Sequence, residues 1–460
     1  MNPHIFRKYD IRGVVETDLT ADVVEHIGRA LGTLARRDGA TTFGLGRDCR
    51  THSPQLRDAL VKGLTACGLE VHDFGMIPTP LLYFGVHHFD LGGGVMITGS
   101  HNPPEFNGFK MMVGKGTLHG EDIQGMLKMI QAGAFIEAAQ TPGGHKEVDV
   151  ISAYTDYVVG NVEMGSWPEG RKLKVIVDAG NGVGGFVAVP LLERLGFDVT
   201  GMFIEPDGTF PNHHPDPVKA KNLVMLIDAI KAQNADLGIA YDGDGDRIGV
   251  VDEKGQVIWG DRLMILLSRA LLEVEPGATI VGEVKCSQTL FDDINAHGGN
   301  AIMWKVGHSL IKSKMKETGA LLAGEMSGHI FFKHRYFGFD DAIYTTARLL
   351  ELLTAKGGPL SDLLADVPTT YATAEIRLEV PDAIKFDIAS NLATKLAGEH
   401  EVVDIDGVRV IFEDGWGLVR ASNTQPALVM RAEALSPERR DAIEAFLRSE
   451  IDTARSALES

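Results

Sequence analysis

The stretch TTFGLGRDCRTHSPQLRDALVKGLTACGLEV, residues 41–71, indicates the fold class of this protein. Residues 41–46 predict a strand, and residues 47–53 form a polar loop. The leucines at positions 56, 60 and 64 then recur at helical spacing, and residues 67–71 end the helix and begin a second strand. Strand, loop, helix and strand at this length predict a βαβ unit, in which the two strands are parallel.

The same pattern recurs twice further along the chain, in residues 173–199 and in residues 279–305. Three copies predict three related α/β domains with mixed, largely parallel sheets, whose ligand-binding loops follow the carboxyl ends of the strands. The remainder differs, because Asp406-Gly407 is a tight hairpin signal between two short strands and residues 437–458 form a long helical pattern. We therefore expect a C-terminal α+β domain. The predicted domains are residues 1–147, 148–252, 253–367 and 368–460.

Composition and charge restrict the class of partner. The 460 residues are 44% hydrophobic and 23% charged, which is typical of a globular protein. A formal net charge of −19 argues against a nucleic acid or an anionic membrane as a partner, but leaves a small anionic substrate open. Three scattered cysteines, Cys49, Cys67 and Cys286, form no disulfide framework. With no signal-peptide core and no apolar run of membrane-spanning length, we expect a soluble, cytoplasmic protein.

The first motif that could take part in a reaction is T-G-S-H-N-P-P, residues 98–104, directly after an apolar strand. Gly99 permits a turn that would expose Ser100 as a reactive hydroxyl, although an ordinary Ser/Asn turn is the simpler alternative. A serine-hydrolase elbow fits poorly, because the G-x-S-x-G pattern is absent. Lys110 would approach Ser100 if the two segments form adjacent strands, and partial burial would lower its pKa and let it act as an acid or base. Taken alone, a lysine at such a position is more often simply solvated.

The second motif is D-G-D-G-D-R, residues 242–247. Carboxylates at every second position, separated by glycine, can converge on one hard cation such as Mg²⁺, and Arg247 beside them suggests a nearby phosphate. A calcium EF-hand would also place Glu253 at its last ligand position, but Arg247 stands where that loop requires glycine and the flanks read as strands. A purely structural acidic turn is the other alternative.

Two further loops carry polar side chains. G-E-M-S-G-H, residues 324–329, offers groups suited to sugar hydroxyls, and R-A-S-N-T-Q-P, residues 420–426, offers donors suited to a phosphate dianion. The alternative for residues 324–329 is an ordinary polar surface loop, and the alternative for residues 420–426 is a capped turn.

Together with the opening F-R-K-Y-D-I-R-G, residues 6–13, these motifs resemble the alpha-D-phosphohexomutase family, in particular its bacterial phosphomannomutase/phosphoglucomutase branch. The resemblance covers essentially the whole chain, with the motifs in the family order. Met326 stands at a position where a phosphoglucosamine mutase more typically carries Gln, so that activity is the alternative within the family.

The resemblance implies a monomeric isomerase of four domains around a central cleft. It implies that Ser100 is carried as phosphoserine and exchanges a phosphoryl group with hexose 1- and 6-phosphates of mannose or glucose, through a hexose 1,6-bisphosphate. It further implies one Mg²⁺ held by Asp242, Asp244, Asp246 and the phosphate of Ser100, with Lys110 transferring protons and His101 assisting. The implied substrate-binding residues are Tyr9, Arg12, Arg247, Lys285, His308, Glu325, Ser327, His329, Arg420, Ser422, Asn423 and Thr424.

Two other classes of function remain. A Mg²⁺-dependent sugar phosphatase could use the same aspartates, but it would release inorganic phosphate where a mutase releases almost none. A non-catalytic sugar-phosphate sensor would not require an intact Ser100 and Asp triad. Preference between mannose and glucose phosphates is not encoded in these motifs.

Overall fold

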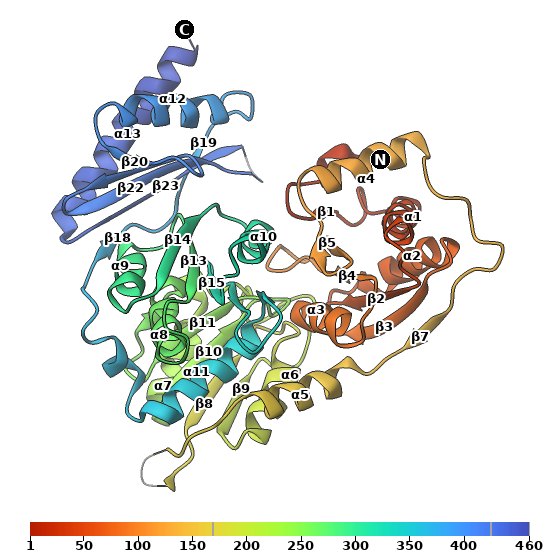
Figure 1. Cartoon of the computed structure of the whole chain (residues 1–460), viewed down its shortest axis with the longest axis horizontal. Coiled ribbons are helices and arrows are strands. Elements are labelled where there is room, and N and C mark those ends of the chain that lie inside the picture. Colours follow the sequence, from red (N-terminus) through yellow and green to blue (C-terminus); the bar gives the residue numbers. More distant parts are fainter. Residues whose placement is uncertain (168–169, 424–425, 460) are drawn as a thin grey trace.

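The computed structural model describes residues 1–167, 170–423 and 426–459, which form four sheets with helices packed against them (Figure 1). The first sheet has the strand order β1-β5-β4-β2-β3-β7, with β6 paired to β5. Its strands are β1 (Ile11–Val14), β2 (Thr42–Arg47), β3 (Glu70–Met76), β4 (Gly93–Ile97), β5 (Phe106–Val113), β6 (Gly116–Thr117) and β7 (His145–Glu147). The helices of this part are α1 (Ala21–Arg37), α2 (Ser53–Ala66), α3 (Thr79–His88), α4 (Glu121–Ala132) and α5 (Val150–Asn161).

The second and third sheets follow in the orders β12-β11-β10-β8-β9 and β14-β13-β15-β16-β17. The second contains β8 (Lys174–Asp178), β9 (Asp198–Met202), β10 (Leu237–Tyr241), β11 (Ile248–Asp252) and β12 (Val257–Ile258), with helices α6 (Gly185–Arg194) and α7 (Val224–Gln233). The third contains β13 (Thr279–Glu283), β14 (Asn300–Trp304), β15 (Leu322–Gly324), β16 (Ile330–Phe332) and β17 (Phe339–Asp340), with α8 (Gly260–Val274), α9 (Gln288–Ala296), α10 (His308–Thr318) and α11 (Ala342–Lys356).

These three sheets repeat one topology. In each, three adjacent strands are parallel: β3-β2-β4, β9-β8-β10 and β14-β13-β15. The next strand along the chain then pairs antiparallel with the last of the three: β5 with β4, β11 with β10, and β16 with β15. The prediction of three related α/β units with mixed, largely parallel sheets is confirmed.

The fourth sheet is different, because all of its strand pairings among the described residues are antiparallel. It contains β18 (Tyr371–Ala372), β19 (Ile376–Glu379), β20 (Glu401–Val403), β21 (Val408–Phe412), β22 (Gly415–Ala421) and β23 (Ala427–Ala434), with α12 (Lys385–Ala397) and α13 (Pro437–Glu459). The expected α+β character of this part is confirmed, and Gly407 has a φ of +81° in the predicted hairpin turn.

The shared topology determines where the motifs lie. In each of the first three sheets, the loop between the last parallel strand and the antiparallel strand carries one motif. These loops are residues 98–105 after β4, residues 242–247 after β10 and residues 325–329 after β15. Loops at the carboxyl ends of parallel strands are where open α/β sheets bind ligands.

The cores show how the parts are joined. One large apolar cluster combines side chains of the first, second and third parts, such as Leu82, Val177 and Ile280, so these parts share a core. The fourth part has its own core around Leu392, Val419 and Ile443. Figure 1 shows this part, in blue, on the opposite side of the molecule from the first, in red and orange. The limits of the four predicted domains stay a proposal; β12 extends the second sheet to Ile258.

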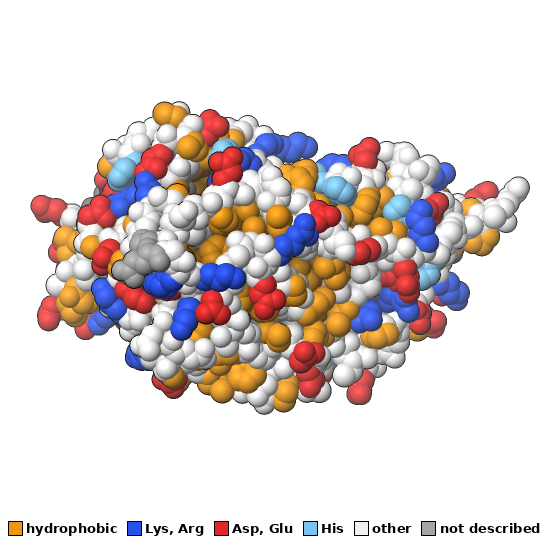
Figure 2. Space-filling model, turned by 90° about the horizontal axis from the view of Figure 1, so that it is seen from below, with side chains coloured by type: hydrophobic (Ala, Val, Ile, Leu, Met, Phe, Trp, Pro, Cys, Tyr) orange, Lys and Arg blue, Asp and Glu red, His pale blue; other side chains and the backbone are white. Residues whose placement is uncertain are grey.

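The surface carries both signs of charge. Figure 2 shows one face on which acidic and basic side chains are interspersed around apolar ones. Within residues 1–167, 170–423 and 426–459, no helix combines the length and the apolar character that crossing a membrane requires.

Candidate active site

Ser100 lies in the loop between β4 and β5 and is almost completely buried. Its φ is +49°, the left-handed region that a non-glycine residue rarely adopts, and its backbone N–H donates to Thr98 Oγ1 at 2.8 Å. The hydroxyl donates to Asp242 Oδ2 at 3.0 Å, and His101 Nδ1 also lies 3.0 Å from it. Backbone strain of this kind clusters at functional sites, so the conformation supports the choice of Ser100.

A buried arginine braces this serine loop. Arg50, in the loop after β2, donates to the carbonyl oxygens of Ser100 at 2.9 Å and Asn102 at 2.7 Å, and also to those of Pro103 and Phe106. Its Nε is 3.2 Å from Asp48 Oδ2, so the charge is paired. Residues 47–53 carry no motif that predicts this role, and the one available signal is a pair of opposite charges at the carboxyl end of a predicted strand.

The loop between β10 and β11 brings Asp242, Asp244 and Asp246 together. One ligand oxygen from each lies within 4.8 Å of the others, and all three residues are fully buried. The flanking elements are paired strands, so the loop is no EF-hand. A Cβ on Gly243 would lie 2.5 Å from the carbonyl oxygen of Ser100, which is closer than real contacts allow. Glycine at this position is therefore what lets the acidic loop touch the serine loop.

Lys110, on β5, projects into the acidic loop. Its Nζ donates to Asp244 Oδ2 at 2.7 Å and also to Asp246 Oδ2. Burial lowers the pKa of Lys110, but the two carboxylates outweigh this and hold the pKa well above its usual value. The expectation that burial would lower this pKa is thus not met in this arrangement, in which Lys110 is positively charged.

The aspartates differ in their electrostatics. Burial, together with the charges of Asp246 and Asp244, raises the pKa of Asp242. Burial also acts on Asp244, but Lys110 and the hydroxyl of Thr79, which donates at 2.6 Å, lower the pKa of Asp244 below its usual range. Desolvation lowers the pKa of His101, and the nearby Arg247 adds to this, so its imidazole is neutral.

The donor set fits a hard divalent cation. The Oδ1 atoms of Asp244 and Asp246 are buried and have no hydrogen-bond partner among the described residues. Lys110 offsets only part of the charge of three buried carboxylates, and a cation would satisfy the two remaining oxygens. The acidic loop is therefore compatible with a divalent metal.

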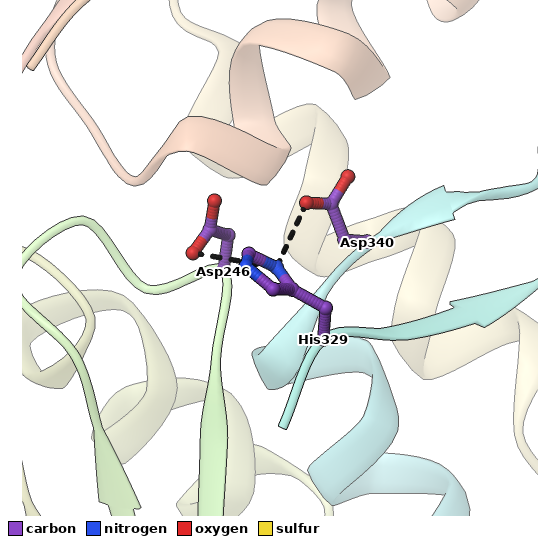
Figure 3. A group of neighbouring side chains, drawn as sticks. All are labelled: Asp246, His329 and Asp340. Carbon is purple, nitrogen blue, oxygen red and sulfur yellow. Dashed lines mark ion pairs between the residues drawn. The ribbon is translucent and has the colours of Figure 1, made fainter. Parts of the chain in front are cut away.

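Figure 3 shows how the third part meets this loop through His329, which lies between Asp246 and Asp340. His329 Nδ1 is 3.0 Å from Asp340 Oδ2 and 3.7 Å from Asp246 Oδ1, while its Nε2 accepts from Arg247 Nε at 2.9 Å. Asp340, on β17, also accepts from Lys312 Nζ at 3.0 Å. Asp340 lies in no recognisable motif, and its place in the site follows only from its buried contacts.

His308, at the start of α10, stacks on His329 with a ring separation of 5.6 Å, and its Nδ1 is 3.8 Å from Asp340 Oδ2. Burial lowers the pKa of His308 well below its usual value, and Lys312 adds to this. The predicted residues His308 and His329 thus form one stacked pair behind the acidic loop.

The loops at the ends of β13 and β15 are linked by a buried carboxylate. Glu283 accepts from the backbone N–H groups of Lys285 at 2.8 Å and Met326 at 3.2 Å. Lys285 Nζ lies 3.2 Å from Glu375 of the fourth part. Glu325 Oε1 accepts from the backbone N–H of Gly307 at 2.7 Å. Ser327 lies in the same loop as Glu325 and is half-buried.

The fourth part contacts the N-terminal segment directly. Asn423 Nδ2 donates to the hydroxyl of Tyr9 at 2.8 Å, and that hydroxyl donates to the carbonyl oxygen of Val306 at 2.9 Å. Lys8 Nζ donates to Asn423 Oδ1 at 3.0 Å. Arg12 donates to Asn102 Oδ1, in the serine loop, at 2.5 Å and pairs with Asp10.

The guanidinium of Arg420 is engaged by Asp406, with Nε 3.0 Å from Oδ2. Asp406 also accepts from the backbone N–H of Val306 at 3.1 Å, so this pair joins the third and fourth parts. Ser422 is buried, and its backbone N–H donates to the carbonyl oxygen of Ala427 at 2.9 Å. Thr424 lies outside the described residues.

Comparison with known proteins agrees with this arrangement. The phosphoglucomutase/phosphomannomutase family models for alpha/beta/alpha domains I, II and III match residues 3–136, 152–255 and 259–371, and the model for the C-terminal domain matches residues 375–450.

Relatives resemble the chain over nearly its whole length. It is 46% identical over 455 residues to a phosphomannomutase/phosphoglucomutase of Pseudomonas aeruginosa, covering 99% of this chain and 96% of that protein. It is 48% identical over 433 residues to a phosphoglucomutase of Neisseria gonorrhoeae, covering 94% of this chain and 93% of that protein. A solved phosphoglucomutase/phosphomannomutase family protein from Burkholderia thailandensis superposes with a TM-score of 0.91 at 42% identity, covering 99% of this chain and 98% of that one.

The family models match all four parts, and relatives are 46–48% identical over nearly the whole chain, which identifies the family. The chain belongs to the alpha-D-phosphohexomutase family, in its bacterial phosphomannomutase/phosphoglucomutase branch.

Proposed function

We propose that this protein is an isomerase that reversibly interconverts hexose 1-phosphate and hexose 6-phosphate, of mannose, of glucose or of both. The observation that carries the proposal is the contact between two segments far apart in the chain. The hydroxyl of Ser100 lies 3.0 Å from the carboxylate of Asp242, inside a buried three-carboxylate loop. A hydroxyl so placed is suited to carry a phosphoryl group beside a metal.

The proposed cycle starts from phosphoserine at position 100. The bond between phosphorus and Ser100 Oγ breaks as a bond forms between phosphorus and the free hydroxyl of the hexose phosphate, which gives hexose 1,6-bisphosphate. The proton of the attacking hydroxyl leaves, and Ser100 Oγ takes one up. After the bisphosphate turns over, its other phosphoryl group returns to Ser100 and the isomeric monophosphate departs. Each transfer needs positioning and charge neutralisation rather than additional covalent chemistry.

Proton movement belongs to Lys110 and His101 in this proposal. His101 Nδ1, 3.0 Å from Ser100 Oγ, is neutral and can accept a proton there. Lys110 is charged and can donate one. The two residues thus supply an acid and a base to the two half-reactions.

We assign one Mg²⁺ to Asp242, Asp244, Asp246 and the phosphate of Ser100. When bound, Mg²⁺ would neutralise charge on the transferring phosphoryl group. The unsatisfied carboxylate oxygens of Asp244 and Asp246 support this choice of ligands.

Substrate binding is proposed for residues of all four parts. Glu325, Ser327 and His329 read the sugar hydroxyls, and Arg420 with its loop holds the phosphate that is not being transferred. The other proposed contacts are Tyr9, Arg12, Arg247, Lys285, His308, Ser422, Asn423 and Thr424. A monomeric state and a cytoplasmic location also stay predictions.

The test is a coupled assay with glucose 1-phosphate, mannose 1-phosphate and glucosamine 1-phosphate, each with a trace of hexose 1,6-bisphosphate. We expect turnover of one or both of the first two without release of inorganic phosphate, and a phosphorylated fraction in the intact mass of the wild type. Ser100→Ala should abolish the phosphorylated species and reduce kcat by at least about a thousandfold, because the covalent step is lost.

Each contrary outcome has a defined meaning. Near-wild-type kcat in Ser100→Ala would refute the phosphoserine mechanism. Stoichiometric release of inorganic phosphate would instead indicate a phosphatase, and a preference for glucosamine 1-phosphate would indicate the phosphoglucosamine mutase activity.

A further inference from the structure

The loop of residues 284–287, between β13 and α9, is held by side chains of the fourth part. Arg409 Nη1 donates to the carbonyl oxygens of Val284 at 2.6 Å and Cys286 at 2.8 Å. Arg431 Nη1 donates to the intervening carbonyl, that of Lys285, at 2.5 Å. Three consecutive carbonyls, centred on Lys285, are therefore bound by two guanidinium groups from β21 and β23.

The side chain of Arg409 is held in place by burial and by contacts with its neighbours. It is fully buried, its guanidinium carbon lies 3.7 Å from the centre of the Trp416 ring, and its Nη2 donates to Gln288 Oε1 at 3.1 Å. Val284, Trp416 and Leu418 form a small apolar cluster around it. A buried arginine is costly unless its donors are used. Nη1 and Nη2 of Arg409 are used, on the 284–287 loop and on Gln288 at the start of α9, whereas Nε has no partner among the described residues.

Arg431 extends the contact to the neighbouring loop. Besides the carbonyl of Lys285, it contacts Met326 Sδ in the loop of residues 325–329. Glu433, on the same strand, accepts from Ser287 Oγ at 2.7 Å and from Trp416 Nε1 at 3.0 Å. Both ends of the 284–287 loop are thus fixed to the fourth sheet.

The same sheet also carries Arg420. Arg420 lies on β22, which pairs with β21, the strand of Arg409, and with β23, the strand of Arg431. The backbone that carries Lys285 is consequently held by the sheet that carries Arg420, and both cationic side chains are almost completely buried. A shift of this backbone relative to Arg420 would break contacts of Arg409 or Arg431.

We propose that Arg409 and Arg431 are positioning residues, which hold the backbone around Lys285 so that Lys285 and Arg420 grip a phosphosugar as one preset unit. Neither arginine touches the reacting atoms; each acts through Lys285. The inference rests on the proposed function, because it gives Lys285 a substrate to bind. It predicts that losing either arginine raises KM for the phosphosugar more than it lowers kcat.

The experiment is a double-mutant cycle with glucose 1-phosphate as the probe. Arg409→Gln alone, and Arg431→Gln alone, should each raise KM by on the order of tenfold, as expected for loss of charged hydrogen bonds that orient a binding group. Lys285→Met should also raise KM. In the Lys285→Met background, Arg409→Gln should raise KM by less than about twofold, because the residue through which it acts is already gone.

Ile443→Ala is the matched control, because Ile443 is buried in the core of the fourth part and lies outside the arginine contacts. Ile443→Ala should lower Tm about as much as Arg409→Gln does, but it should leave KM within about twofold of the wild type. Additive effects of Arg409→Gln and Lys285→Met on KM, or an equal KM change in Ile443→Ala, would overturn the proposal.

A second measurement does not depend on activity. Hydrogen exchange of the amides of residues 284–287 should be faster in Arg409→Gln than in the wild type and unchanged in Ile443→Ala. Unchanged exchange in Arg409→Gln would refute the positioning role. Absence of turnover in the wild type would refute the proposed function instead, and the exchange result would stand by itself.

Discussion

At the scale of the residue, the neighbours of each aspartate in the acidic loop determine its pKa. Asp242, Asp244 and Asp246 are alike in sequence, but Lys110 contacts two of them and the hydroxyl of Ser100 contacts the third. Burial raises the pKa of Asp242, whereas the pKa of Asp244 is lowered because Lys110 outweighs burial. One loop therefore presents carboxylates of different proton affinity beside the hydroxyl of Ser100.

Asp244→Asn tests the metal assignment at this scale. The substitution removes one anionic ligand and leaves Lys110 with one carboxylate fewer, so Mg²⁺ affinity should fall by at least about tenfold and kcat should fall with it. Activity measured against Mg²⁺ concentration gives both quantities. Asp198→Asn, on the exposed end of β9, is the matched control and should change neither. Full activity with Ca²⁺ but not with Mg²⁺ would show that the proposed metal is wrong.

At the scale of the element, one strand order places three loops at one junction. Each loop joins a parallel strand to the antiparallel strand beside it, so all three emerge from the same end of their sheets. Close approach of two of these loops depends on Gly243, where any Cβ would collide with the backbone of Ser100. The close approach of these two loops thus restricts position 243 to glycine.

Gly243→Ala should therefore impair catalysis more than folding. A Cβ 2.5 Å from the carbonyl oxygen of Ser100 must push the acidic and serine loops apart. Misplacement of this kind costs on the order of a hundredfold in kcat, while Tm should fall by only a few degrees. Gly125→Ala, on α4, is the control, because nothing lies within 4 Å of the added Cβ. Wild-type kcat in Gly243→Ala would show that the two loops need no such contact.

Asp341, at the start of α11, makes the stability of the folded chain depend on pH. Asp341 accepts from the backbone N–H of Tyr344 at 2.8 Å and from the hydroxyls of Tyr154 and Tyr336. Burial raises the pKa of Asp341 to about 7, although these donors oppose the rise. An unfolded Asp has a pKa of about 4, so the folded chain binds the extra proton between about pH 4 and pH 7. The resulting stability is present below about pH 4 and is lost as the pH rises to about 7.

Asp341→Asn removes this titration. Relative to the wild type, the variant should be more stable at pH 8 than at pH 5, by up to about 2.7 kcal/mol, because this interval crosses about two of the three pK units of the shift. Scanning calorimetry of both proteins at the two pH values measures the difference in Tm. A Tm difference that does not vary with pH would show that Asp341 is ionised in the folded chain throughout this range.

At the scale of the whole molecule, the fourth part connects to both the third and the first. Asn423 reaches Tyr9, whose hydroxyl reaches Val306, and Asp406 joins Arg420 to the backbone N–H of the same residue, Val306. These contacts join segments from the two ends of the chain around the loops that carry Ser100 and the aspartates. A ligand held by Arg420 would lie among them.

Arg420→Ala tests this arrangement. The guanidinium should grip the phosphate that is not being transferred, in both orientations of the sugar, so KM should rise for glucose 1-phosphate and mannose 1-phosphate alike. The expected penalty is about 1.5–3 kcal/mol, as for a charged hydrogen bond. Phosphorylation of Ser100 and Mg²⁺ affinity should stay nearly unchanged, and more hexose 1,6-bisphosphate should escape during turnover.

Arg439→Ala provides the control, because Arg439 pairs with Asp414 on the fourth part without contacting the site. Its KM values should match those of the wild type. Unaltered KM for both substrates in Arg420→Ala would remove this loop from the mechanism.

Local patterns in the sequence were enough for the α/β units, the antiparallel C-terminal part and three of the motif loops, whereas Arg420, expected in the fourth loop, lies on β22. Hydrophobic periodicity and glycine spacing are properties of short segments, so the strand after residue 41 and the hairpin at Asp406-Gly407 are readable without knowing the rest of the chain. The candidates Ser100 and the three aspartates are equally local, because each stands in a dense motif.

The supporting residues were decided only by the tertiary structure. Arg50, Asp340 and Arg409 each lie outside any recognisable motif, and each gains its role from partners at other places in the chain. The sign of the shift in the pKa of Lys110 is of the same kind, because it depends on carboxylates more than a hundred residues away. Burial and charge pairing are sums over all neighbours in space, and those neighbours exist only once the chain has folded.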